Sequence, residues 1–123
     1  MENQLTILSE SLDKKLEVLQ KIREYNKRQE EIFSAEEVDM SLFDDAVEEK
    51  QRLIDEVVHL DEGFEIMYEK LAKELEGNRE RYAAQIRELQ KKVSRVTELS
   101  VTVQAQEARN KKLIENYFAK ERA

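Results

Sequence analysis

The sequence predicts an all-α protein: an elongated antiparallel three-helix bundle, or coiled coil, with an overhanging C-terminal helix. Three observations favour this fold class. The 123 residues include no proline and only two glycines. Charged residues and apolar residues each make up 40% of the chain, as in long solvated helices with one apolar face. Apolar residues recur at steps of three and four over long stretches, which is the period of a helix. We therefore treat residues 1–123 as a single helical domain.

The first helix is predicted over residues 3–33. An apolar stripe begins at Leu5 and continues at helical spacing as far as Ile22. Beyond Ile22 the stripe weakens, because Asn26 and Gln29 take positions that should face a neighbouring helix. The stripe consists of Leu5, Leu8, Leu12, Leu19 and Ile22, with Leu16 and Val18 beside it.

Residues 34–41 are predicted to connect the first helix to the second. Ser41 and Asp44 have the spacing of a capping box, in which a hydroxyl satisfies a free backbone N–H at a helix start. We therefore favour Ser41 as the N-cap of the second helix, with Asp39 as the alternative. Asp44 and Asp45 would then lie in the first turn, where the helix dipole favours negative charge.

The second helix is predicted over residues 42–76 and has the clearest stripe of the chain. Val47, Ile54 and Leu75 broaden this stripe, which suits contact with two other helices. Gly63 lies inside the helix at a cost of about 1 kcal/mol relative to alanine. We attribute it to a close helix approach or to room for a bulky neighbour, with a hinge as the alternative. The stripe runs through Phe43, Ala46, Lys50, Leu53, Val57, Leu60, Phe64, Met67 and Leu71.

The third helix is predicted over residues 79–120, after a tight turn at Gly77-Asn78. The alternative is one continuous helix over residues 42–119. We expect the third helix to pair antiparallel with the second. At about 1.5 Å per residue it should then overhang the start of the second helix by about two turns, around residues 113–120. Its stripe consists of Ile86, Leu89, Val93, Val96, Ser100 and Val103.

Charge is distributed unevenly along the chain, whose formal net charge is −7. Residues 30–49 contain nine acidic residues and no basic residue. Residues 50–77 carry a net charge of −4, and residues 78–123 carry +5. We expect the basic third segment to lie along the acidic second one. The overall negative charge argues against nucleic-acid binding.

Candidate catalytic and metal-binding residues are almost absent. The chain has no cysteine and one histidine, His59, which falls beside the predicted stripe. No Gly-rich phosphate loop and no nucleophile–histidine pair can be assembled. We therefore expect no enzyme activity, no catalytic residue, no metal and no cofactor. Residues 1–20 lack the pattern of a secretion signal, and no apolar stretch approaches the roughly 20 residues of a membrane span. A cytoplasmic location without membrane insertion is expected.

Polar residues interrupt the predicted interface between the second and third helices at Lys50, Glu107 and Asn110. Such residues either fix the register of the helices or loosen this end so that it can open. Apolar residues then return in the C-terminal tail. We assign partner binding to this region, with the alternative that the tail packs on Phe33, Met40 and Phe43 as core. The candidate partner-binding residues are Val103, Glu107, Asn110, Leu113, Ile114, Tyr117 and Phe118.

Two stretches carry a family resemblance. KQRLIDEVVHLDEGFE at residues 50–65 and QAQEARNKKLI at residues 104–114 resemble flagellar export chaperones of the FlgN/FliT type. The resemblance implies a cytoplasmic helical protein that binds a helical terminus of a hook-associated or filament-cap protein. Binding prevents premature assembly and delivers the client to the export apparatus. The resemblance places the binding surface between Val103 and Phe118.

This sequence departs from that family in one respect. Many relatives have a longer linker between their last helices, whereas Gly77-Asn78 is the only break here. The identity of the client therefore stays open. A second hypothesis is a structural coiled-coil subunit or scaffold that self-associates through the same stripes, for instance as a homodimer.

Overall fold

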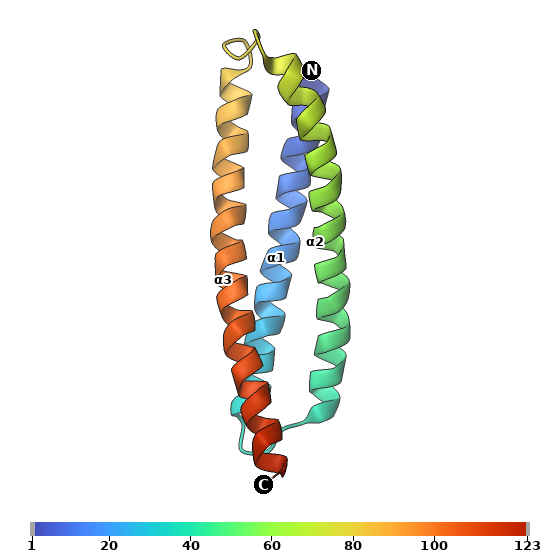
Figure 1. The fold of residues 1–123 in the computed structure, drawn as a ribbon, viewed down its shortest axis with the longest axis vertical. Coiled ribbons are helices and arrows are strands. Elements are labelled where there is room, and N and C mark those ends of the chain that lie inside the picture. The colour runs from blue at the N-terminus through green and yellow to red at the C-terminus, as the bar shows by residue number, and fades with distance from the viewer. Residues whose placement is uncertain (1, 123) are drawn as a thin grey trace.

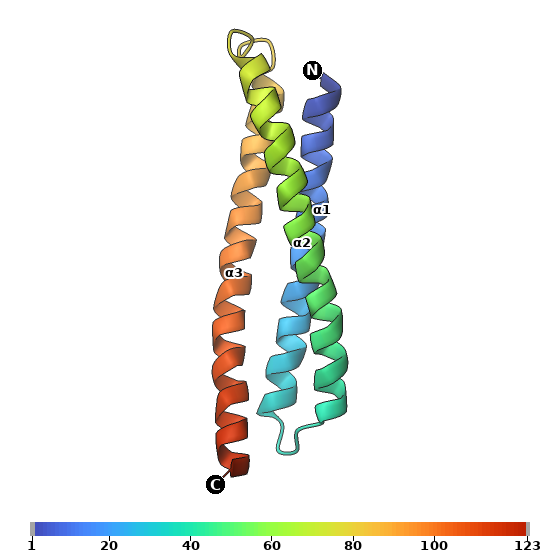
Figure 2. The same cartoon turned by 45° about the vertical axis from the view of Figure 1, so that its right-hand side comes forward.

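The computed structural model describes residues 2–122 and arranges them as three long helices side by side (Figure 1). The helices are α1 (Glu2–Ser34), α2 (Met40–Leu75) and α3 (Ala83–Arg122). Helices α1 and α3 run in the same direction, and α2, which connects them, runs in the opposite direction (Figures 1 and 2). The last turns of α3 extend past the connection between α1 and α2. The predicted all-α fold class is confirmed.

Helix α2 begins at Met40, and its N-cap is Asp39. The Asp39 Oδ1 accepts hydrogen bonds from the backbone N–H groups of Ser41, at 3.0 Å, and Leu42, at 3.3 Å. The preference for Ser41 was therefore wrong. A carboxylate two positions earlier reaches the free N–H groups first, so the helix starts sooner. Asp44 and Asp45 accordingly lie beyond the first turn, which contains no acidic residue.

The connection between α2 and α3 is longer than the predicted tight turn. Gly77 adopts a φ of +90°, a left-handed conformation that glycine reaches without a Cβ clash. Asn78 N–H then donates to the Leu75 carbonyl at 2.9 Å, which ends α2. Residues 76–82 form turns, and α3 starts at Ala83 rather than at residue 79. The alternative of one continuous helix is wrong.

Two apolar clusters form the core, and α1 contributes to both. The middle cluster is built around Leu12, Val18, Leu19, Ile22, Leu53, Val96, Leu99 and Val103. The second cluster closes the end that holds the 76–82 connection, where buried Tyr82 packs with Leu5, Leu8, Leu71 and Leu75. Each leucine or isoleucine buried in this way stabilises the fold by about 1.5–3 kcal/mol before entropy is counted.

Helix α1 lies at the centre of the packing, and α2 and α3 lie against it. Among residues 2–122, no Cα atom of α2 comes within 8 Å of a Cα atom of α3, whereas α1 approaches both helices that closely. The second and third helices run antiparallel as predicted and share both apolar clusters, but they approach each other less closely than either approaches α1. The stripe of α1 gives one side to each neighbour, so α2 and α3 both pack closely on α1, and they meet each other through side chains such as those of Lys50 and Glu107.

The ion pairs follow the same arrangement. Acidic residues of α2 pair with lysines of α1, as in Lys15–Asp61 and in Lys14–Glu56, at 3.9 Å. The expected attraction between basic α3 and acidic α2 is not what joins these helices. Their ion pair has the opposite polarity, with Lys50 on α2 and Glu107 on α3.

Two further expectations are settled by the fold. No atom lies within 4 Å of where a Gly63 Cβ would stand, apart from its own helix, so neither a close helix approach nor a bulky neighbour explains this glycine. The hinge interpretation of Gly63 stays a prediction.

None of the three described helices has the length and apolar character needed to cross a membrane.

Candidate functional site

The separation of α2 from α3 leaves an open strip along the bundle, which we call the α2–α3 seam. Each helix lines it with residues spaced by seven, and such residues share one face of a helix. On α2 the stripe is Val47, Ile54, Asp61 and Tyr68. On α3 it is Ile86, Val93, Ser100, Glu107 and Ile114.

A small hollow shows that these two stripes face one another. Its volume is about 140 Å³, and Asp61 and Phe64 of α2 line it together with Val93 and Thr97 of α3. Lys15 of α1 also lines the hollow and pairs with Asp61. Helix α1 therefore forms the floor of the seam, and the two stripes form its edges.

Apolar side chains on the seam stay uncovered. Val47 is 39% exposed, Val93 is 43% exposed and Tyr68 is 53% exposed. In a bundle with three mutual contacts, such positions would be covered by the neighbouring helix. Here no Cα atom of α2 lies within 8 Å of one of α3, and these three side chains stay exposed. The seam is consequently a strip on which exposed apolar side chains alternate with the polar residues Asp61, Ser100 and Glu107.

A polar layer crosses the bundle beneath the lower part of the seam, and Lys50 is its centre. Its Nζ donates to Asn26 Oδ1 at 3.3 Å, to Gln29 Oε1 at 2.9 Å and to Glu107 Oε2 at 3.0 Å. An ammonium group has three donors, so each of them has an acceptor. Asn110 Nδ2 donates to the Asn26 carbonyl at 2.9 Å, which ties α3 to α1.

This layer has the character of a register device. Asn26, Gln29 and Asn110 are each at least 97% buried, and each takes part in the hydrogen bonding around Lys50. A shift of one helix along another would leave these groups without partners, at a cost of about 1–3 kcal/mol for each. The layer therefore supports the register interpretation of the polar positions over a loosened seam.

Beyond the polar layer, aromatic residues close the lower end of the bundle. The Phe33 ring packs edge to face with Phe43, at 4.9 Å between centroids, and with Tyr117, at 5.4 Å. Tyr117 packs in turn on Phe118 at 5.4 Å. Tyr117 of the C-terminal tail is thus docked on Phe33 of α1, as part of the core alternative expected, while Phe118 remains 40% exposed.

The predicted partner-binding residues divide into two groups. Val103 is 8% exposed within the middle cluster, and Asn110 is 3% exposed within the polar layer. Val103 is covered within the core, whereas Asn110 lines a hollow beside Glu107 and Ile114 and donates to the Asn26 carbonyl of α1. Their assignment to partner binding stays a prediction. Half-buried Leu113 and Tyr117 lie on the docked tail.

The other predicted residues reach the seam or its end. Glu107 and Ile114 line a hollow of about 500 Å³ together with Lys50 and Lys111. Phe118 follows on the next turn of α3. Sequence reasoning missed Val47, Val93 and Tyr68 as surface residues. The sequence signal that could have identified them is a second series of residues at seven-residue spacing. On α3 this series lies three residues N-terminal to the buried series.

The described residues offer no arrangement for metal chemistry. No group of three or more His, Cys, Asp or Glu side chains among them is placed to hold a metal ion. His59 is exposed on α2.

The chain matches no protein-family model, no curated protein and no solved structure. Its function is therefore inferred from the seam and from the residues around it.

Proposed function

We propose that this protein is a helix-binding export chaperone, which receives an amphipathic helix of a client protein in the α2–α3 seam. The observation that carries the proposal is that α2 and α3 approach each other less closely than either approaches α1, with exposed apolar residues along both edges of the seam. A fourth helix laid in the seam would cover Val47 and Val93 and complete a four-helix bundle.

The client class follows from the resemblance of residues 50–65 and 104–114 to flagellar export chaperones. On that basis the client is a helical terminus of a hook-associated or filament-cap protein, held in the cytoplasm until export. Covering the apolar face of the terminus would prevent it from pairing with other subunits. Delivery of the client to the export apparatus belongs to the same proposal.

The seam also offers a reason for a defined client position. Exposed apolar residues lie on its edges on both sides of the Lys50–Glu107 pair, whose Nζ and Oε1 atoms lie 3.0 Å apart, and Asp61 and Ser100 interrupt them. The Glu107 side chain is 38% exposed, although its Oε1 atom is buried and its Oε2 atom accepts from Lys50. A client helix with a polar residue between two apolar turns would match that pattern. Ile114 and Phe118 would extend the contact beyond it.

The test measures binding of fluorescently labelled peptides that correspond to the terminal helices of hook-associated and filament-cap proteins from the source organism. Combined substitution of Val47→Glu and Val93→Glu places charge on both edges of the seam. We expect the dissociation constant from fluorescence anisotropy to rise at least about tenfold, or roughly 1.4 kcal/mol. Circular dichroism should be unchanged, since both side chains are already exposed.

The matched control is Ile7→Glu with Ile66→Glu, which adds the same charge at exposed apolar positions outside the seam. Ile66 lies five residues from Asp61 and therefore about 140° around α2. This control should bind the peptide as the parent does. Absence of binding by every terminal peptide, or an equal loss in both variants, would contradict the proposal.

A structural coiled-coil subunit remains the second candidate, because the same exposed edges suit a second copy of the chain. Sedimentation equilibrium separates the two functions. A dimer that persists at every concentration and dissociates on Val47→Glu with Val93→Glu would assign the seam to self-association. A monomer that binds the terminal peptides supports the chaperone.

A further inference from the structure

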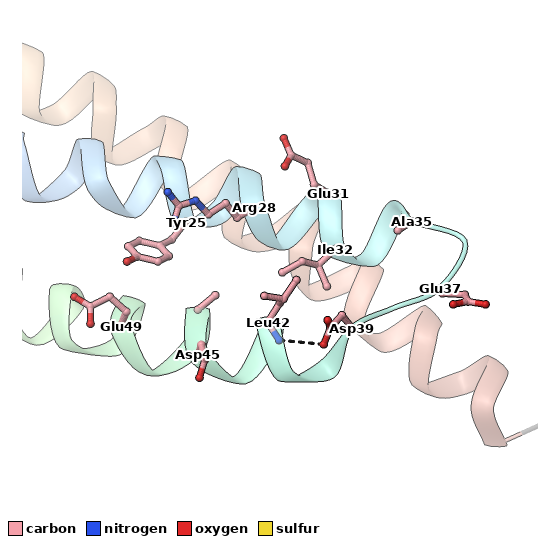
Figure 3. Close-up of a pocket in the computed structure, with 11 residues that line it drawn as sticks. Tyr25, Arg28, Glu31, Ile32, Ala35, Glu37, Asp39, Leu42, Asp45 and Glu49 are labelled. Carbon is pink, nitrogen blue, oxygen red and sulfur yellow. Dashed lines mark hydrogen bonds between the residues drawn. The ribbon is translucent and has the colours of Figure 1, made fainter.

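A second groove lies between the end of α1 and the start of α2, on a part of the surface where no α3 residue contributes (Figure 3). Its volume is about 670 Å³. The side chains of Ile32 and Leu42 meet across it, and Tyr25 closes it further along α1. Leu42 is 55% exposed although it lies in the first turn of α2. The groove thus has an apolar floor that this chain leaves uncovered.

Carboxylates border this floor on both sides. Glu31 extends outward from α1, and Asp45 extends outward from α2, so the two flank the groove (Figure 3). Glu37, Asp39 and Glu49 also line it. The complete lining contains one cation, that of Arg28, which lies over the Tyr25 ring at 5.1 Å and faces that ring.

Glu49 is paired with Arg52 of the same helix at 3.5 Å, whereas Glu31, Glu37 and Asp45 have no such partner among the described residues. Among the described residues, no cation lies within 4.0 Å of the carboxylates of Glu31, Glu37 or Asp45. The surrounding segment, residues 30–49, contains nine acids and no base. Like charges held this close repel one another, and a partner that brings positive charge relieves the repulsion.

From the apolar floor and this charge pattern, we infer that the α1–α2 groove binds a basic amphipathic helix of a partner protein. The apolar face of that helix would cover Leu42 and Ile32, and lysine or arginine side chains on its flanks would meet Glu31 and Asp45. This surface is separate from the α2–α3 seam. The bundle would therefore hold two partners at once, one on each face of α2.

The test uses a synthetic 18-residue helix of leucine and lysine, and the same helix with glutamate in place of lysine. We expect the lysine peptide to bind at about 150 mM salt, where exposed charges are screened beyond roughly 8 Å, and the glutamate peptide not to bind. Glu31→Lys with Asp45→Lys should weaken binding of the lysine peptide at least about tenfold. Leu42→Ala should weaken it about fivefold, because the apolar floor contributes directly.

The matched control is Asp44→Lys with Glu48→Lys, which makes the same charge change in the same segment but outside the groove. This variant should bind within about twofold of the parent. Equal weakening in both charge variants, or no effect of Leu42→Ala, would reduce the interaction to general attraction and overturn the inference. A dimer of the free chain that dissociates on Glu31→Lys with Asp45→Lys would also overturn it, by making a second copy the occupant.

The inference and the proposed function can fail separately. Val47→Glu with Val93→Glu changes the seam alone, and it should leave binding of the lysine peptide unchanged. Loss of that binding in the seam variant would place the basic helix in the seam and overturn the assignment to the α1–α2 groove. Failure of every flagellar terminal peptide would leave the groove assignment standing.

Discussion

The end of the bundle beside the 76–82 connection and the end beside the 35–39 connection solve the same packing problem with different chemistry. At the first end, leucines of α1 and α2 pack with Tyr82 in an apolar cluster. At the second end, the interior is the polar layer around Lys50, followed by the aromatic contacts of Phe33. Both surfaces that we propose for partners lie at or extend to the second end.

The two ends of the bundle contribute differently to stability and to recognition. Apolar burial stabilises without direction, so the first end can contribute free energy but does little to fix register. Hydrogen bonds are directional, so the polar layer sets the relative positions of α1, α2 and α3. A bundle with a fixed register can leave α2 and α3 apart, and it thereby presents a seam of constant shape.

The largest expected effect tests the stability of the apolar end. Leu8 is 1% exposed, and its replacement by alanine should lower the free energy of unfolding by about 3 kcal/mol, from lost burial and the cavity left behind. The matched change Leu42→Ala, at the other end and 55% exposed, should cost less than about 0.5 kcal/mol. Urea unfolding followed by circular dichroism measures both. Equal losses of unfolding free energy in the two variants would contradict the proposed difference in stability between the two ends.

An intermediate effect is expected from the polar layer. Lys50→Met removes three hydrogen bonds and leaves Asn26 and Gln29 with unpaired acceptors, for a loss of about 2 kcal/mol in the free energy of unfolding. Lys92→Met removes a more exposed lysine whose partners are Ser9 and Asp13, and it should cost less than about 1 kcal/mol. Urea titration distinguishes the two. An unchanged or raised stability of Lys50→Met would show that the layer contributes only to register.

The smallest effects concern the two glycines and should have opposite signs. Gly77→Ala forces an alanine to a φ of +90° and should lower the free energy of unfolding by about 1 kcal/mol. Gly63→Ala meets no neighbouring atom on a helical backbone and should raise it by up to about 1 kcal/mol. Thermal unfolding of the two variants measures the difference. A destabilising Gly63→Ala would favour a hinge at this position.

Sequence reasoning located the helices well because their signals are local. The stripe from Leu5 to Ile22 and the break at Gly77 depend only on residues close together in the chain. The site was predicted in part for the same reason. Glu107 and Ile114 were found on the correct helix, but Val103 and Asn110 were placed on the surface although they are buried. Whether an apolar residue faces a partner or the chain itself depends on a distant helix, and heptad spacing does not contain that information.

The sequence by itself determined that this chain forms three long helices, where they break, and that its polar residues gather toward one end. These properties follow from backbone preference and from the helical period, which act over a few residues. Only the tertiary structure decided that α1 is the central helix and that α2 and α3 stand apart. Three amphipathic helices can be ordered in more than one way with similar apolar burial. The choice rests on contacts of α1 with residues far along the chain, such as that of Asn110 with the Asn26 carbonyl, 84 positions apart.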